Sequence, residues 1–362
     1  SSRLLKIQSW ERSLEGNVEL KSQLEKCKKA TVQLRQLPSE SKNDVLRAAA
    51  DLIDLSFEKI IAANREDIKA LSSSNDERTK TTAFQDRLLL DRKRISAMTE
   101  GLRSIASLDD PTHHIDESRR LTNGLLLKKV RSPLGLIFMI FESRPNVAIE
   151  AFAMAFKAGN AIILRGGKES MHTTAVLYSL LRKALAQEGV PEDCLWGIDD
   201  PNRELALELL KQKKYIDLVV PRGGEGLISF VEENSLIPII KNDRGLCHVY
   251  VHADADLEMA INIIENAKVQ RPGVCNAMES LLVHESIKNE FLPKLHARLS
   301  ENRVEWHVCR DSLKVLKGKP FVHVAGSQSW DTEYLDLKMN CRVVKNLSEA
   351  LEHIELHGSK HS

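Results

Sequence analysis

From Leu134 onward, short apolar runs alternate with longer amphipathic stretches, and this alternation constrains the fold more than any other feature of the chain. LGLIFMI and AIIL are apolar throughout, as strands buried on both faces of a sheet are. The stretches VAIEAFAMAFKAGN and HTTAVLYSLLRKALAQEG carry apolar residues at helical spacing. Strand, helix and strand in repetition predict a parallel sheet with helices on both faces, a doubly wound α/β domain.

The alternation runs in two series, which predicts two domains in a chain of 362 residues. DCLWGI, RELALELLKQ and YIDLVV continue the first series to about residue 245. The second series begins at GLCHVYVHADAD and continues through LEMAINIIENAKVQ, SLLVHESI and NEFLPKLHARLSEN. It closes with LKMNCRVVKNLSEALEHIELHGSKHS, which starts a further strand and helix.

The first hundred residues are predicted to be helical. Apolar positions form one broad stripe along KNDVLRAAADLIDLSFEKIIAANREDIKAL, and Ser39 or Ser41 can cap its start. DRKRISAMTEGLRSIASL predicts another helix, and the polar segment SSSNDERTKTT before it is expected to loop out. In RRLTNGLLLKKV, Asn123-Gly124 separates two strand-like runs and predicts a β-hairpin.

Charge and cysteine usage exclude several classes of protein. With 52 basic and 51 acidic side chains, the net charge of +1 offers no general attraction for nucleic acid or an anionic membrane. No apolar run approaches the ~18 residues of a transmembrane helix, and the polar N-terminus does not resemble a secretion signal. The six cysteines form no CxxC pair, so we expect free thiols and a cytoplasmic location. Cys247, His248 and His252 supply too few ligands at unsuitable spacing, so no metal site is expected.

Cys275 is the first candidate for chemistry. It follows the turn signal Pro272-Gly273 and precedes a strand-like run. A cysteine at such an end can be exposed, with nearby backbone N–H groups, and Arg271, to favour its thiolate. The alternative is a small buried core residue.

Asn146 lies in FESRPNVAIEAF, between a predicted buried strand and the following helix. Ligands of open α/β sheets collect at the carboxyl ends of strands, where an amide can donate to a developing oxyanion. Alternatively, Pro145-Asn146 only turns the chain and caps the helix. The neighbouring Arg144 is a candidate for binding a phosphate or a substrate carboxylate, although it can equally form a surface pair with Glu142.

Two glycine-containing segments, ILRGGKES and VPRGGEGL, also follow predicted strands. The glycines allow a ligand to approach the backbone, a helix start favours anions, and the cations can bind phosphate. Neither segment matches GxGxxG, and both can be solvated turns. The residues concerned are Arg165, Gly166, Gly167 and Lys168 in the first segment and Arg222, Gly223 and Gly224 in the second.

Taken together, these segments resemble the gamma-glutamyl phosphate reductase family of the aldehyde dehydrogenase superfamily. ESRPNV, GNAIILRGGKE, YIDLVVPRGG, GLCHVYV, NAKVQRPGVCN and ALEHIELHGSKHS match in order and spacing over nearly the whole chain. The resemblance implies an aldehyde dehydrogenase-like α/β fold. Residues 1–115 and 134–245 would form an NADPH-binding domain, 116–133 a small oligomerisation hairpin, and 246–362 a catalytic domain. The C-terminal part of the family pattern lies beyond Ser362.

The resemblance also implies roles for single residues. Cys275 matches the catalytic cysteine, and Asn146 matches the oxyanion-hole asparagine. Arg165 falls where relatives usually have a lysine that touches the adenosine ribose. The residues expected to bind the cofactor are Arg165, Gly166, Gly167, Lys168, Arg222, Gly223 and Gly224. Lys168 falls where NAD-preferring relatives often carry a carboxylate that repels a 2′-phosphate, so a cation there favours NADPH.

The implied reaction is the NADPH-dependent reduction of L-glutamyl 5-phosphate to L-glutamate 5-semialdehyde and phosphate, through a thioester on Cys275, in proline biosynthesis. A homo-oligomer is expected, and glutamate 5-kinase is a candidate partner. Hydrolytic aldehyde dehydrogenases carry a general-base glutamate in an ELGGK-like segment, whereas the corresponding KNDRGLCHVYV has none. Because such a base would hydrolyse the thioester, its absence disfavours a hydrolytic semialdehyde dehydrogenase. A truncated, non-catalytic oligomerisation partner is the other alternative, against which the intact Cys275, Asn146 and Arg165 argue.

Overall fold

A computed structural model describes residues 2–72, 82–241 and 244–361. The chain divides into two compact units, Ser1–Lys241 and Asn242–Ser362, which we describe separately as unit 1 and unit 2. Unit 1 ends at Lys241, four residues before residue 245, where the first predicted domain ends. Most of the predicted loop SSSNDERTKTT lies outside the described residues.

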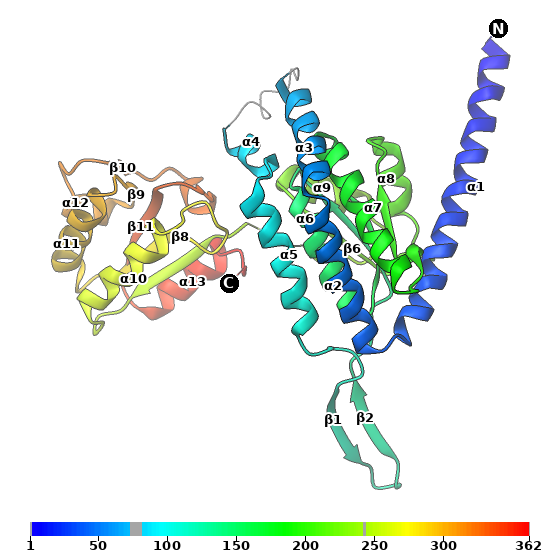
Figure 1. Cartoon of the computed structure of the whole chain (residues 1–362). Helices are drawn as coiled ribbons and strands as arrows, with labels where there is room; N and C mark the ends of the chain where they lie inside the picture. The colour runs from blue at the N-terminus through cyan, green and yellow to red at the C-terminus, as the bar shows by residue number, and fades with distance from the viewer. Residues whose placement is uncertain (1, 73–81, 242–243, 362) are drawn as a thin grey trace. The chain divides into compact units, whose positions relative to one another are not determined.

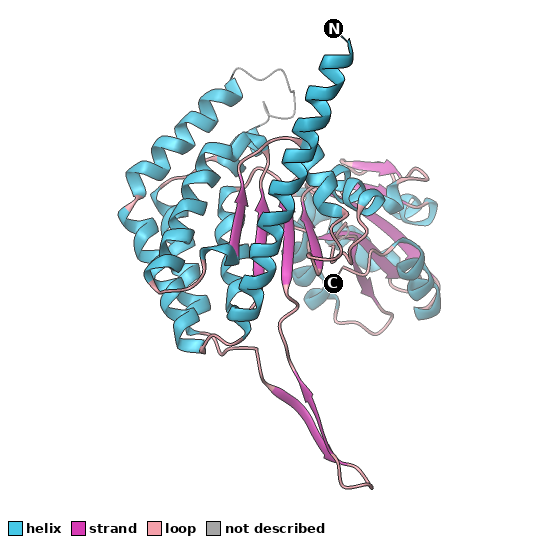
Figure 2. Ribbon diagram, turned by 90° about the vertical axis from the view of Figure 1, so that its right-hand side faces the viewer, coloured by secondary structure: helices cyan, strands magenta, loops and turns pink. Residues whose placement is uncertain are grey.

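Unit 1 is built on a four-stranded sheet whose strands are all parallel, in the order β5-β4-β3-β6. The strands are β3 (Leu136–Phe141), β4 (Ala161–Arg165), β5 (Leu195–Ile198) and β6 (Leu218–Arg222). Figure 2 shows them side by side with helices around them. Phe138 of β3 pairs with Ile163 of β4 and with Val219 of β6. The parallel ladders put the carboxyl ends of these strands at one edge of the sheet.

Helices cover both faces of this sheet. Ile137 and Phe141 of β3 belong to the core that also contains side chains of α2, α5, α6 and α7. Phe138 and Ile140 belong to a second core, shared with α1, α8 and α9. Successive side chains of a strand point to opposite faces, which explains why the predicted strands are apolar throughout. The helices of unit 1 are α1 (Ser2–Arg35), α2 (Ser39–Leu55), α3 (Phe57–Ser72), α4 (Thr82–Leu88), α5 (Arg92–Ser107), α6 (Pro145–Lys157), η2 (Lys168–Ser170), α7 (Met171–Gln187), η3 (Glu192–Cys194), α8 (Arg203–Leu210) and α9 (Glu225–Asn234).

The N-terminal helices differ from the prediction in two respects. The continuous apolar stripe is broken at Ser56, whose N–H donates to the carbonyls of Leu52 and Ile53, and α3 starts at the next residue. The predicted serine cap is wrong, because Pro38 is the N-cap of α2 and Ser39 already lies inside the helix. The predicted helix at α5 is confirmed, and the Asp91 carboxylate caps it by accepting from the Arg94 N–H.

The predicted hairpin is present. β1 (Ile115–Arg120) and β2 (Leu126–Val130) pair antiparallel, and the connecting turn contains Gly124 in the left-handed region at φ +87°. The Asn-Gly pair predicted this turn because glycine adopts positive φ without a steric penalty. Every residue of both strands is exposed, and the hairpin extends away from the helices of unit 1 (Figure 1).

Unit 2 contains a five-stranded parallel sheet in the order β10-β9-β11-β8-β7. Its strands are β7 (Cys247–Val251), β8 (Met278–His284), β9 (Glu305–Val308), β10 (Val322–Val324) and β11 (Lys338–Val344). Its helices are α10 (Leu257–Val269), α11 (Lys288–Ser300), α12 (Arg310–Val315), η4 (Ser329–Asp331) and α13 (Leu347–His357). α10 and α11 share the main core with Leu281 of β8, whereas Ala350 of α13 packs with Leu282. The predicted α/β fold class therefore holds in both units.

No helix within the described ranges is both long enough and apolar enough to cross a bilayer.

Candidate functional site

Cys275 lies on the surface of unit 2, in the loop between α10 and β8. Two successive turns shape this loop, because the Val274 N–H donates to the Arg271 carbonyl and the Ala277 N–H donates to the Val274 carbonyl. The exposure of Cys275 removes the alternative of a buried core cysteine. Its role as nucleophile stays a prediction.

Three other cysteines have the opposite environment. Cys27, Cys194 and Cys341 are buried, and burial raises the pKa of each thiol to about 12. Such thiols are inert at neutral pH, since the thiolate is the reactive form. Cys247 and Cys309 are partly buried, whereas Cys275 is exposed. Cys275 is therefore the most accessible thiol of the described residues.

The loop around Cys275 rests on the segment that leads into β7. A Cβ atom added to Gly245 would lie 2.5 Å from the carbonyl carbon of Cys275, which is shorter than any normal contact between carbon atoms. Only glycine therefore fits at position 245 without moving the loop of Cys275. The Cys247 thiol donates to the Cys275 carbonyl at 3.4 Å, and the Gly245 N–H donates to Glu333 Oε1 at 2.9 Å. No sequence pattern predicted the contributions of Gly245 and Glu333. The glycine before the β7 run is the one local signal of a close approach between backbones.

Two buried residues that flank the Cys275 loop in the sequence, Lys268 before it and Glu279 after it, form an ion pair. Lys268, near the end of α10, and Glu279, in β8, are 0% and 1% exposed, and their charged atoms are 3.2 Å apart. Burial lowers the pKa of Lys268, and burial raises the pKa of Glu279. The other oxygen of Glu279 accepts from the Leu335 N–H. The pair therefore ties together the two elements from which the loop of Cys275 starts and ends.

In unit 1, the loops after β3 and β4 interlock at the carboxyl edge of the sheet. The Ser143 hydroxyl donates to Glu169 Oε2 at 2.6 Å. A Cβ atom on Gly167 would lie 2.5 Å from Ser143 Oγ, so a larger residue here would have to displace the Ser143 side chain. On Gly166 it would lie 3.2 Å from the Phe141 ring, a tight contact. The two predicted glycines therefore allow close backbone packing at this edge.

Arg165 and Lys168 present the cations predicted for this edge. Arg165 Nη2 donates to the carbonyls of Pro201 and Asn202 at 3.0 and 3.2 Å, and its buried Nε has no partner. Burial lowers the pKa of the Arg165 guanidinium. Lys168 is exposed, and no carboxylate of the described chain lies within ion-pair distance of it.

The predicted anion preference at the start of α7 is met from within the protein. The buried carboxylate of Asp67 accepts from the N–H groups of His172 and Thr173 at 3.0 and 2.8 Å. A ligand anion at this helix start would have to displace Asp67, so this part of the expectation is corrected. Asp67 lies on α3, about a hundred residues before α7, which is why sequence patterns did not reveal it.

Asn146 lies in the first turn of α6 and does not cap the helix. Arg144 is the N-cap residue without a side-chain bond, and Pro145 occupies the first helical position. The Asn146 amide donates to Glu150 Oε1 at 2.9 Å, one turn further along. The capping alternative is therefore excluded, and the amide is partly exposed at the carboxyl end of β3.

The loop after β6 is closed by Glu142. Its Oε1 accepts from the Gly224 N–H at 2.8 Å, and a Cβ atom on Gly223 would lie 2.7 Å from Glu142 Cγ. The Glu142 N–H donates to the Arg222 carbonyl at 3.0 Å. The alternative of an Arg144–Glu142 surface ion pair is not observed among the described residues.

The structure thus gathers all the predicted unit 1 residues at the carboxyl ends of β3, β4 and β6, and it exposes Cys275 on unit 2. Among residues 2–72, 82–241 and 244–361, no group of three histidine, cysteine or acidic side chains is arranged to hold a metal ion. His248 uses its Nδ1–H to donate to the Leu246 carbonyl.

Comparison with known proteins gives a consistent result. The family model described as "Aldehyde dehydrogenase family" matches residues 10–312. The gamma-glutamyl phosphate reductase of Nautilia profundicola is 43% identical over 343 residues, which is 95% of this chain and 82% of that protein. The one from Carboxydothermus hydrogenoformans is 44% identical over 93% of this chain and 80% of its own length. The crystal structure of gamma-glutamyl phosphate reductase from Thermotoga maritima superposes with a TM-score of 0.89 at 39% identity, covering 94% of this chain and 80% of that one.

Proposed function

Because this chain belongs to the aldehyde dehydrogenase family, among its gamma-glutamyl phosphate reductases, we propose that it reduces L-glutamyl 5-phosphate to L-glutamate 5-semialdehyde and phosphate with NADPH. The observation that carries this proposal is the exposed thiol of Cys275, in a turn whose backbone packs closely against Gly245. The family recognised from the sequence is confirmed. The role of each site residue is part of the proposal.

Cys275 begins the chemistry. Its thiolate attacks the acyl carbon, a C–S bond forms, and the C–O bond to phosphate breaks so that phosphate leaves with the electron pair. The Asn146 amide and the Cys275 backbone N–H donate to the oxyanion, and each such donor is typically worth about 3 kcal/mol in the transition state. Collapse of the reduced adduct breaks the C–S bond again, which releases the aldehyde and restores the thiolate.

The residues at the β4 edge of unit 1 suit a phosphorylated nicotinamide cofactor. Arg165 has a buried Nε without a partner, and no carboxylate of the described residues lies within ion-pair distance of the exposed Lys168, so both can bind an anionic ligand. Glu169, the nearest acidic neighbour in sequence, is engaged by the Ser143 hydroxyl. When bound, NADPH supplies the hydride that reduces the thioester. A cation at Lys168 favours the 2′-phosphate of NADPH over NADH.

Water must be kept from acting on the thioester. The segment before β7 holds no glutamate, and the Glu333 carboxylate near the Cys275 loop accepts from the Gly245 N–H. This hydrogen bond gives Glu333 a structural role, so we do not assign it as a general base that activates water. The thioester is therefore expected to react with hydride or with phosphate and not with water.

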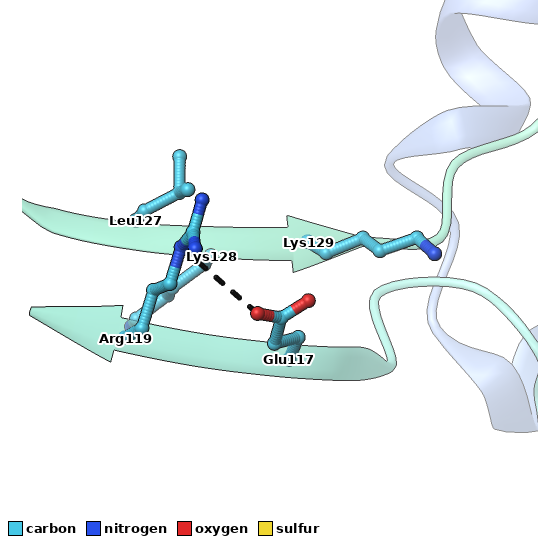
Figure 3. A pocket seen from close by; sticks show the side chains of 5 residues that line it. All are labelled: Glu117, Arg119, Leu127, Lys128 and Lys129. Atoms are coloured by element: carbon cyan, nitrogen blue, oxygen red, sulfur yellow. Dashed lines mark ion pairs between the residues drawn. The ribbon is translucent and has the colours of Figure 1, made fainter.

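The exposed hairpin supports self-association. Its strands carry apolar side chains in contact with solvent, including Leu126, Leu127 and Val130 at about half exposure. Figure 3 shows Leu127 beside Arg119, whose guanidinium approaches Glu117 at 4.0 Å. A two-stranded ribbon with both edges unpaired is stabilised when another sheet covers it. We place the homo-oligomer contact here, the enzyme in the cytoplasm, and glutamate 5-kinase as a candidate partner that would deliver the unstable acyl phosphate.

Replacement of Cys275 tests the function. With glutamate semialdehyde, phosphate and NADP+, the unmodified chain should produce NADPH only when phosphate is present. Cys275→Ala should lose turnover and keep cofactor binding, whereas the matched control Cys309→Ala in the same unit should stay active. Turnover without phosphate would indicate a hydrolytic dehydrogenase, and full activity of Cys275→Ala would refute the thioester route.

A further inference from the structure

The segment 244–246 of unit 2 leads into β7 and supports the loop of Cys275. Gly245 lies so close to this loop that an added Cβ atom would stand 2.8 Å from the Cα of Cys275. The Cys247 thiol, just after the segment, donates to the Cys275 carbonyl at 3.4 Å. Because closely packed backbone atoms leave no free space, a shift of segment 244–246 moves the Cys275 backbone with it.

Two parts of unit 2 that are remote in the sequence hold this segment. The Arg244 guanidinium donates to the carbonyl of Asp331, the last residue of η4, at 2.8 Å. The Leu246 N–H donates to Ser359 Oγ, two residues after the end of α13, at 3.0 Å. The N–H of the residue between them donates to Glu333 at 2.9 Å. Each residue of the segment therefore has a partner more than eighty positions away.

His357, the last residue of α13, joins these two parts. Its Nδ1 lies 2.8 Å from Asp331 Oδ1, and Nδ1 carries the hydrogen because a carboxylate only accepts. The His357 side chain is only 14% exposed, since its ring packs against the His353 ring with centroids 4.6 Å apart. The His353 ring in turn meets the Trp330 ring edge to face at 5.4 Å. The end of α13 therefore holds segment 244–246 directly through Ser359 and indirectly through Asp331.

The connection from η4 to β11 is also fixed at its other end. Leu335 adopts φ +52°, a left-handed conformation that is unfavourable for a bulky side chain. Its N–H donates to Glu279 Oε1 at 3.2 Å, and Glu279 is the buried partner of Lys268. A strained conformation persists only where the surrounding contacts hold it. The connection is therefore held both at Asp331 and at Leu335.

We propose that His357, Asp331 and Ser359 are positioning residues for the Cys275 nucleophile. This proposal rests on the proposed function, in which the Cys275 thiolate attacks the acyl carbon. The three side chains act through segment 244–246, and by fixing that segment they fix the backbone that carries the thiolate. Such positioning affects the rate because the rate of attack depends steeply on where the reacting atoms stand.

Single and double substitutions test the link between His357 and Asp331. His357→Ala and Asp331→Ala break the same bond, so each should lower kcat for phosphate-dependent NADP+ reduction about 10-fold and leave the KM for NADP+ unchanged. The double variant should match either single variant within about 2-fold, because two residues that act through one interaction are not additive. His357→Asn keeps an N–H donor near the position of Nδ1 and should recover most of the activity. Ser359→Ala should lower kcat, whereas Ser359→Thr, which keeps the hydroxyl, should not.

A second measurement reports on the thiol without turnover. The rate at which iodoacetamide labels Cys275, followed by mass spectrometry of its peptide, should change by the same factor in His357→Ala and Asp331→Ala and return in His357→Asn. Glu355→Ala is the matched control, because it removes an exposed ion pair with Lys360 from the same helix. This control should keep both the labelling rate and kcat. The midpoint of thermal unfolding, measured for each chain, shows which variants are folded at the assay temperature.

The outcomes separate the two proposals. Equal losses of kcat in the two single variants, without a further loss in the double variant, support the positioning role. Unchanged kcat and unchanged labelling in folded variants would overturn it, and so would losses that multiply in the double variant. If His357→Ala does not fold, Asp331→Ala decides in its place, since the Asp331 side chain is half exposed. A chain whose Cys275 labelling responds to these changes but which shows no phosphate-dependent turnover would contradict the proposed function alone.

Discussion

Gly245 should be indispensable for the reactivity of Cys275. In Gly245→Ala, the new methyl carbon would lie 2.5 Å from the carbonyl carbon and 2.8 Å from the Cα of Cys275, and closer still to the carbonyl oxygen. All three atoms are backbone, so no side chain can turn aside to relieve the overlap. Carbon atoms in contact normally stand about 3.5 Å apart, which requires the loop of Cys275 to retreat by about 1 Å.

A displacement of this size is large for catalysis. Misplacing a reacting group by about 1 Å can lower the rate roughly 100-fold, equivalent to about 2.7 kcal/mol of activation free energy. We therefore expect kcat/KM for phosphate-dependent NADP+ reduction to fall by about two orders of magnitude. The rate at which iodoacetamide labels the Cys275 thiol should change as well, because the thiol loses its place on the turn.

Gly326→Ala provides the control in the same unit. A Cβ atom there would meet only Ser329 Oγ, at the ordinary contact distance of 3.8 Å. This variant should keep its activity and its midpoint of thermal unfolding. If Gly245→Ala folds normally and turns over within a few-fold of the unmodified chain, the close packing of Gly245 against Cys275 does not position the nucleophile.

Three further changes follow from charges. Lys168→Glu should raise the KM for NADPH roughly 10-fold or more and leave that for NADH nearly unchanged, since a carboxylate repels the 2′-phosphate; equal effects on both cofactors in steady-state kinetics would contradict this role. Glu279→Gln leaves the buried Lys268 charge unpaired and should lower the free energy of unfolding by about 3 kcal/mol, whereas Lys268→Met with Glu279→Leu should recover most of the loss. A double variant as unstable as the single one in urea titrations would refute the pairing argument. Burial lowers the pKa of His353 from 6.5 to about 3, so the unfolded chain takes up the proton first. The free energy of unfolding is therefore highest above about pH 6.5 and falls towards pH 3, by up to about 1.4 kcal/mol per pH unit. In urea unfolding at a series of pH values, His353→Gln should show a weaker pH dependence of this free energy.

The strands and the hairpin could be predicted because their signals are local. A strand buried on both faces must be apolar at consecutive positions, as β3 and β4 are. The turn at Gly124 needs a residue that tolerates positive φ, and Asn-Gly announces it. The break at Ser56 escaped prediction because the apolar stripe continues across it. The short strands β9 and β10 were missed because three or four residues are too few to display a period.

The amino-acid order alone determined the alternation of strands and helices, the family, and the thiol that we propose as the nucleophile. The folded structure decided which charges find partners: Asp67 occupies the start of α7, Glu142 closes the loop after β6, and no carboxylate of the described residues lies within ion-pair distance of Lys168. Periodic patterns report only which side of an element is buried. Contacts between side chains up to a hundred or more residues apart depend on how the elements pack, and that packing exists only in the folded chain.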